Sequence, residues 1–167
     1  MLAIVAPVAG RLEWTRHALE LAEASSDPRC VKWPGSLYNN LGWTCHEQGR
    51  YEQALEYFRL ALVWRERQGV ADLVRVARWC IARCLRSLGQ VAEALRMQEA
   101  LQAGFEADGT SDGYVCEELG ECLLALGRAG EARPWFARAH AVLAQDTWLR
   151  AEEPERLARL QRLGQGA

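Results

Sequence analysis

One frame of small residues recurs three times along the chain. A small residue is followed seven positions later by glycine and five positions after that by alanine. The three copies are Gly42-Gly49-Ala54, Ala82-Gly89-Ala94 and Gly120-Gly127-Ala132, and they lie 40 and 38 residues apart. A period of roughly 20 to 50 residues is typical of stacked repeats, in which no single unit can bury its apolar face alone.

Apolar residues follow helical spacing on both sides of the central glycine of each copy. Around Gly49 they are Tyr38, Leu41 and Cys45 before it, and Leu55, Phe58 and Leu62 after it. Spacing of three and four residues predicts a helix on each side, so each copy is expected to form a helical hairpin. The central glycine supplies the positive backbone angle that ends the first helix.

The first small residue of each copy is expected to matter for packing within the hairpin. We expect Gly42 to face Ala54, so that two small side chains let the helices approach along ridges and grooves. Glycine inside a helix costs roughly 1 kcal/mol relative to alanine. Close packing must offset that loss.

The first copy resembles the tetratricopeptide repeat family. The matching residues are Tyr38, Leu41-Gly42, Gly49-Arg50-Tyr51, Ala54 and Phe58, and residues 113–145 repeat the pattern. In the middle copy Arg78 and Gln98 replace the expected aromatic residues. The long period is similar to that of the kinesin-light-chain-like variety. The resemblance implies an all-α fold, a right-handed α-α superhelix of helical hairpins with a C-terminal capping helix.

The length indicates one domain, residues 1–167. Its expected parts are a partial leading hairpin (1–26), repeats at 35–68, 75–108 and 113–146, and a capping helix (152–164) with Leu157, Leu160 and Leu163 on its inner face. We expect Asp72 to cap the helix that ends near Leu88, and Thr110, Ser111 or Asp112 to cap the next. The arginine row Arg156, Arg159 and Arg162 is interpreted as a solvated face, and Trp14, Trp64 and Trp135 as packing residues.

Composition narrows the possible partners and location. The net charge is −2, which gives no broad field for nucleic acid or an anionic membrane. The apolar opening MLAIVAPVAG is too short to span a membrane and lacks the basic leader of a signal peptide. Six cysteines without a C-x-x-C pair indicate reduced thiols and a cytoplasmic protein. One lysine against nineteen arginines favours a GC-rich bacterial genome.

The resemblance implies that the concave wall of the stack binds an extended peptide or a helix. Residues one step beyond the core positions face that wall. The candidate peptide-binding residues are Asn39, Asn40, Trp43, His46, Trp79, Arg83, Arg86, Tyr114, Glu117 and Glu121. Ser36, Glu47, Val76, Cys80, Glu118 and Leu124 lie on the same wall or at its margin.

Two interpretations of these side chains stay open. Arg83 and Arg86 are suited to acidic residues of a partner, and Glu117 and Glu121 to basic ones, but the two sets could equally pair with each other. The indoles of Trp43 and Trp79 are either binding anchors or packing groups. Proteins of this family can grip a chaperone's terminal carboxylate with lysines, which the repeats here lack, so that role is not expected.

The sequence therefore predicts a non-catalytic protein-interaction scaffold that needs no cofactor or metal. An alternative is a regulatory module that forms a homodimer through its open N-terminal end. A third hypothesis is a thiol-dependent or metal-dependent enzyme, because Cys80 and Cys84 lie one helical turn apart and His46 or Cys116 could approach them. Cysteines at tight helix contacts are far commoner than such sites, and no catalytic signature accompanies them.

Overall fold

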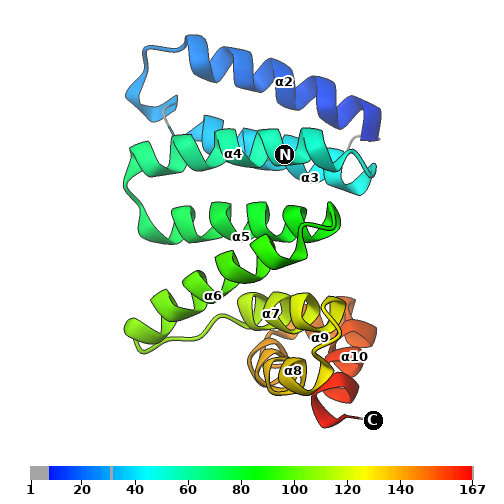
Figure 1. Cartoon of the computed structure of the whole chain (residues 1–167). Coiled ribbons are helices and arrows are strands. Elements are labelled where there is room, and N and C mark those ends of the chain that lie inside the picture. Colours follow the sequence, from blue (N-terminus) through cyan, green and yellow to red (C-terminus); the bar gives the residue numbers. More distant parts are fainter. Residues whose placement is uncertain (1–7, 31, 167) are drawn as a thin grey trace. The chain divides into compact units, whose positions relative to one another are not determined.

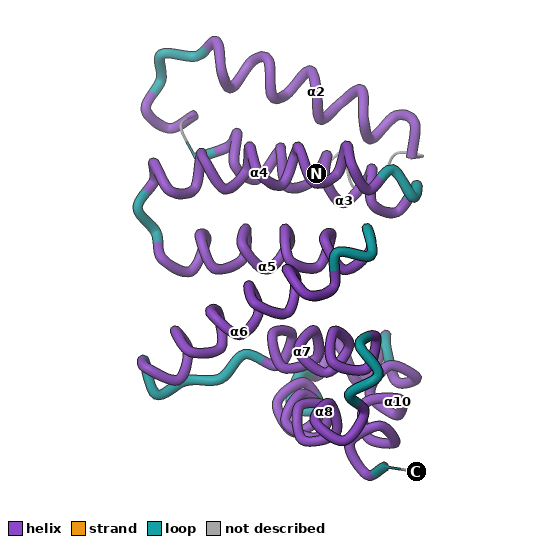
Figure 2. Tube along the Cα trace, in the orientation of Figure 1, coloured by secondary structure: helices purple, strands orange, loops and turns teal. Residues whose placement is uncertain are grey.

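The computed structural model describes residues 8–30 and 32–166, and within these ranges the chain forms helices and no strand (Figure 1, Figure 2). The predicted all-α class is confirmed. The helices are α2 (Val8–Ala24), η1 (Pro28–Cys30), α3 (Trp33–Glu47), α4 (Tyr51–Gln68), α5 (Ala71–Ser87), α6 (Val91–Ala107), α7 (Gly113–Ala125), α8 (Ala129–Leu143), α9 (Thr147–Glu152) and α10 (Pro154–Gln165). None of these described helices has the length and apolar character needed to cross a bilayer.

The chain divides into two compact units, Met1–Leu88 and Gly89–Ala167. The division falls inside the expected middle repeat. In the first unit α2 packs on α3, α3 on α4 and α4 on α5, in the order from blue to green in Figure 1. The hydroxyl of Tyr38 on α3 donates to Glu23 of α2 over 2.8 Å. Of the expected leading hairpin, residues 1–7 lie outside the described residues.

The first small residue of the frame makes room for an aromatic ring. A side-chain carbon at Gly42 would lie 2.5 Å from the ring of Phe58, which is fully buried. A carbon at Gly120 would lie 2.8 Å from the ring of Phe136. The nearest atoms to Gly42 thus belong to Phe58, one helical turn beyond the expected partner Ala54 along α4.

A second glycine at the start of each flanking copy was missed by sequence reasoning. Gly113 precedes Gly120 by seven residues, and a side-chain carbon there would lie 2.7 Å from Leu143. Gly35 has the same place in the first copy, 3.2 Å from Cγ of Arg65. Seven residues are two helical turns, so this spacing was the signal that could have placed both glycines of a copy on one face.

The turn glycines behave as the sequence predicts. Gly49, Gly89 and Gly127 have φ values of 73°, 78° and 76°. After Gly49, the amide of Arg50 donates to the carbonyl of Cys45 over 3.0 Å, which satisfies a carbonyl at the end of α3.

In the second unit α6 packs on α7, α7 on α8, and α10 on α8. Asp112 caps α7 by accepting from the amides of Tyr114 and Val115, as expected. The predicted cap at Asp72 is wrong. The helix α5 begins two residues earlier than that role requires, and its cap position is Val70. Asp72 lies instead in the first turn, 3.7 Å from Arg75.

The closing helix α10 packs on α8, and both closing helices bury leucines. Leu149 of α9 and Leu160 of α10 are fully buried, and Leu157 is nearly so. Gly164 lies against the backbone of Ala137, where a side-chain carbon would approach within 2.8 Å. This contact joins α10 firmly to α8.

The middle copy of the frame has glutamine, Gln98, where the other two copies have phenylalanine. Gln98 occupies the frame position of Phe58 and Phe136 and is fully buried. Neither its amide nitrogen nor its amide oxygen has a hydrogen-bond partner in the described part of the chain. A buried amide without partners is destabilising.

Candidate functional site

Two side-chain hydrogen bonds join α3 to α5 within the first unit. The thiol of Cys80 donates to Oδ1 of Asn39 over 3.3 Å, and Nε2 of His46 lies 2.9 Å from Oγ of Ser87. Both pairs are 41 residues apart, so the two helices run in the same direction in one register. We name the surface they share the α3/α5 face; it consists of Asn39, Trp43, His46, Trp79, Arg83, Arg86 and Ser87.

The middle of the α3/α5 face carries two indoles. The ring centroids of Trp43 and Trp79 lie 5.9 Å apart, and Trp43 also meets the ring of Phe58 edge-on at 5.1 Å. Both tryptophans are half-buried. Each ring is therefore held by packing and still offers accessible area, as an anchor for a bound segment requires.

Asn39 is oriented by the thiol beside it. Cys80 is almost fully buried, and burial raises the pKa of its thiol to about 12, so it remains a donor near neutral pH. The amide oxygen of Asn39 accepts from that thiol. The NH2 group of the half-buried Asn39 is then the donor that this side chain can offer to a bound segment. Its neighbour Asn40 is exposed.

The carboxyl-terminal end of the face is basic. Arg83 donates from Nη1 to Oγ of Ser87 over 2.9 Å, the same hydroxyl that contacts His46. The pKa of His46 is lowered, first by burial and then by the charges of Arg83 and Arg86, while Glu47 acts in the opposite direction. His46 is therefore neutral near pH 7 in an environment of positive potential.

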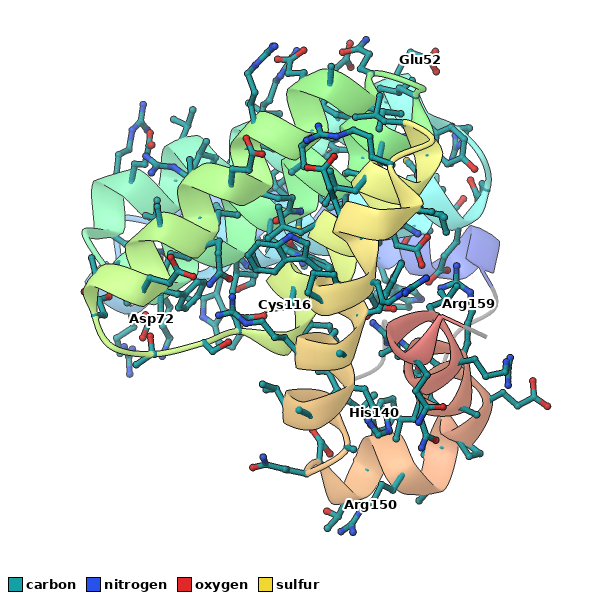
Figure 3. The ribbon with its side chains drawn as sticks, turned by 60° about the horizontal axis from the view of Figure 1, so that its bottom comes forward. Glu52, Asp72, Cys116, His140, Arg150 and Arg159 are labelled. Atoms are coloured by element: carbon teal, nitrogen blue, oxygen red, sulfur yellow. The ribbon has the colours of Figure 1, made fainter. Side chains whose placement is uncertain are left out.

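The cysteines make separate contacts. The thiol of Cys84 donates to the backbone carbonyl of Tyr51 over 3.2 Å, whereas Cys80 bonds to Asn39. Burial raises the pKa of Cys84 to about 11. Cys116, labelled in Figure 3, lies on α7 with its thiol 3.7 Å from the amide oxygen of Gln102. Within the described ranges no group of three histidine, cysteine or acidic residues is placed to hold a metal ion.

In the second unit, the candidate residues on α7 contact the closing helix. Nε of Arg156 lies 3.0 Å and 3.2 Å from the two carboxylate oxygens of Glu117, and its Nη1 lies 2.9 Å from Glu153. Its guanidinium also lies 5.3 Å from the ring centroid of Tyr114. Burial lowers the pKa of Arg156, but the bonds to Glu117 and Glu153 more than compensate and raise it above the ordinary value.

Arg159, one turn after Arg156, also contacts a glutamate of α7 and an aromatic ring. Arg159 of α10, labelled in Figure 3, forms an ion pair with Glu121 and lies 6.0 Å from the ring centroid of Phe136. The interpretation of this arginine row as a solvated face is therefore wrong for Arg156, which is only partly exposed and pairs with a buried carboxylate, whereas Arg159 and Arg162 are exposed as expected. Mutual pairing of Arg83 and Arg86 with the two glutamates was one of the two interpretations left open by the sequence. In the structure α10 supplies an arginine to each glutamate.

The helical frame and the paired helices agree with comparisons to known proteins. Residues 36–63 match the tetratricopeptide repeat family model. This segment contains most of α3 and α4 and includes Asn39, Trp43 and His46. The expected resemblance of the first copy to a tetratricopeptide repeat is thus confirmed. No curated protein sequence matches the chain.

Solved tetratricopeptide-like structures share the fold along most of the chain. The nearly identical TPR-like repeats of a predicted kinesin light chain from Podosopora anserina align with 95% of this chain and 79% of that one, at a TM-score of 0.63 and 19% identity. BtubC (BKLC) from P. vanneervenii aligns with 93% of this chain and 63% of its own length, at a TM-score of 0.67 and 19% identity. The helical-repeat fold and its likeness to kinesin light chain repeats are confirmed.

Proposed function

We propose that this protein is a non-catalytic scaffold that binds a segment of a partner protein on the α3/α5 face. The observation that carries the proposal is the fixed register of α3 and α5, which places two half-buried indoles beside polar and basic side chains. The tetratricopeptide-like fold supports protein binding in general. The free cysteines, all buried except Cys30, are consistent with a reduced bacterial cytoplasm.

Each part of the face has its own role in this proposal. The indoles of Trp43 and Trp79 receive an apolar side chain, and the NH2 group of Asn39 donates to a backbone carbonyl of the segment. Arg83 and Arg86 attract acidic side chains. Tyr114, Glu117 and Glu121 are not assigned to this site, because α10 already contacts all three.

Selection from a displayed library of random peptides tests the proposal. The double variant Arg83→Glu, Arg86→Glu and the single variant Trp43→Ala should lose the peptides that wild type enriches. The matched control reverses the charge of two exposed arginines of the second unit, Arg150→Glu and Arg162→Glu. This control should still bind the peptides that wild type enriches. Equal recovery by the wild type and the Arg83, Arg86 variant would remove the α3/α5 face as the binding site.

A second candidate function is self-association through the first described helix. The expectation that Trp14 packs inside is wrong: Trp14 is 55% exposed, and Leu21, two turns further along α2, is 61% exposed. Two large apolar side chains on one exposed helix face suit contact with another copy. Light scattering should then show a dimer that Trp14→Glu converts to a monomer, and a monomer at every concentration would exclude this function.

A further inference from the structure

A hydroxyl group at the basic end of the α3/α5 face joins a histidine to an arginine. Oγ of Ser87 lies 2.9 Å from Nε2 of His46 and 2.9 Å from Nη1 of Arg83, and 3.4 Å from the backbone carbonyl of Arg83. The ring of His46 contacts the rings of Trp43 and Tyr51, with centroid distances of 5.2 Å and 5.0 Å. We name His46, Arg83, Arg86 and Ser87 the His46 cluster.

The hydroxyl of Ser87 can serve both protonation states of His46. A guanidinium can only donate, so Ser87 accepts from Arg83 in either state. When His46 is neutral, the hydroxyl proton points to Nε2. When His46 is protonated, Nε2 donates to Ser87 and the hydroxyl proton turns to the carbonyl of Arg83. Since hydrogen bonds are available in both states, the surrounding charge decides which state is populated.

The charges around His46 oppose a proton when no ligand is bound. Arg83 and Arg86 approach from α5, Glu47 lies on the same helix as His46, and α4 contributes the ring of Tyr51. Burial and the two arginines outweigh Glu47, because the pKa of His46 lies below its ordinary value. The cluster therefore disfavours a histidinium ion near neutral pH.

An acidic ligand would supply the missing charge. We infer that the His46 cluster receives a carboxylate of the bound segment and that His46 takes up a proton when it does so. This inference rests on the proposed function of the α3/α5 face and names the chemistry of its partner, a segment with acidic side chains. Because proton binding and ligand binding are linked, each favours the other by the same factor.

Affinity for an acidic segment then depends on pH. Near pH 7.5 His46 is neutral. Binding is then weaker, because the free energy of protonating His46 is subtracted from it or the contact between His46 and the carboxylate is not made. Near pH 5.5 more of the protein carries the proton in advance, so binding is tighter. If the carboxylate makes proton binding by His46 about tenfold tighter, the affinity for the segment rises by up to about tenfold across this range.

Nuclear magnetic resonance can follow the two parts of the site separately. The probe is an acetylated, amidated peptide of Asp, Glu and Leu, and its control is the peptide with Asn and Gln in place of the acids. Shifts of the indole N–H signals of Trp43 and Trp79 report binding to the face. The carbon-bound ring protons of His46 report its pKa with and without peptide.

The acidic peptide should shift the indole signals and raise the pKa of His46, and the neutral peptide should leave that pKa unchanged. The variant His46→Gln keeps a polar contact to Ser87 but cannot take a charge, so its affinity should no longer rise at low pH. His17→Gln on exposed α2 is the matched control and should behave as wild type.

Two outcomes would overturn the inference in distinguishable ways. Indole shifts without a change in the pKa of His46 would exclude the proton-linked carboxylate site and leave the proposed face standing. The absence of any shift at millimolar peptide would exclude both. An unchanged pH dependence in His46→Gln would assign the effect to a group outside the cluster and refute the inference as well.

Discussion

The contact between Gly42 and Phe58 leads to a quantitative prediction for the variant Gly42→Ala. The new carbon would lie 2.5 Å, 2.6 Å and 3.0 Å from three atoms of the Phe58 ring. The ring cannot move away freely, because it is fully buried and Trp43 packs on it edge-on. Overpacking of this kind costs about 1 to 3 kcal/mol. Alanine returns roughly 1 kcal/mol of helix propensity, so we expect a net loss of about 1 kcal/mol.

The matched control is Gly130→Ala in α8. It makes the same chemical change within a helix, but a side-chain carbon at Gly130 meets no atom within 4 Å. This variant should gain up to about 1 kcal/mol from propensity alone. The second variant of a double-mutant cycle, Phe58→Leu, removes the ring and should reduce the penalty of alanine at position 42.

Urea unfolding followed by circular dichroism and by tryptophan fluorescence measures these differences. Both signals are needed because the chain has two compact units, which need not unfold together. A Gly42→Ala protein as stable as Gly130→Ala would show that no ring lies against position 42. An unchanged penalty in the Phe58→Leu background would refute the assignment to that ring.

Three further predictions concern polar groups. Gln98→Leu removes a buried amide without partners and should stabilise the protein by about 1 kcal/mol in urea unfolding, whereas Gln102→Leu, which removes a hydrogen-bonded amide, should destabilise it. Arg156→Ala leaves a buried carboxylate on α7 unpaired and should cost about 1 to 3 kcal/mol, whereas the exposed Arg162→Ala should change stability by less than about 0.5 kcal/mol. The pKa of His46 is lowered in the folded protein, so the unfolded chain binds the proton first as the pH decreases. The free energy of unfolding should therefore fall below about pH 6.5. A free energy of unfolding that does not change with pH in this range, in wild type and in His46→Gln alike, would contradict this.

The local features of the fold could be predicted from the sequence because they depend on neighbours along the chain. The frame around Gly49 combines three-four apolar spacing with a glycine turn, and both follow from the geometry of one hairpin. Asp112 was predicted for the same reason as one of three candidate caps of α7, and it is the one that forms the cap. The cap at Asp72 was not formed, since α5 begins at Ala71 and that choice depends on how the preceding turn packs.

In the candidate site, the features that depend on one helix could be predicted, and those that depend on two helices could not. The residues of the α3/α5 face other than Ser87 were predicted as candidates, because their positions relative to the apolar core follow from helical periodicity. The hydrogen bonds of Asn39 to Cys80 and of His46 to Ser87 could not be predicted. They depend on how far α3 and α5 are shifted along each other, and these two helices are not consecutive in the sequence.

The amino-acid sequence alone determined that this protein is built from glycine-terminated helical hairpins. Only the tertiary structure decided which charged groups meet. Arg156 and Glu117 are 39 residues apart, and they pair because α10 packs its leucines against α8 and thereby brings its arginines to α7. Periodicity states which face a residue occupies, but the partner of that face depends on how separate helices pack.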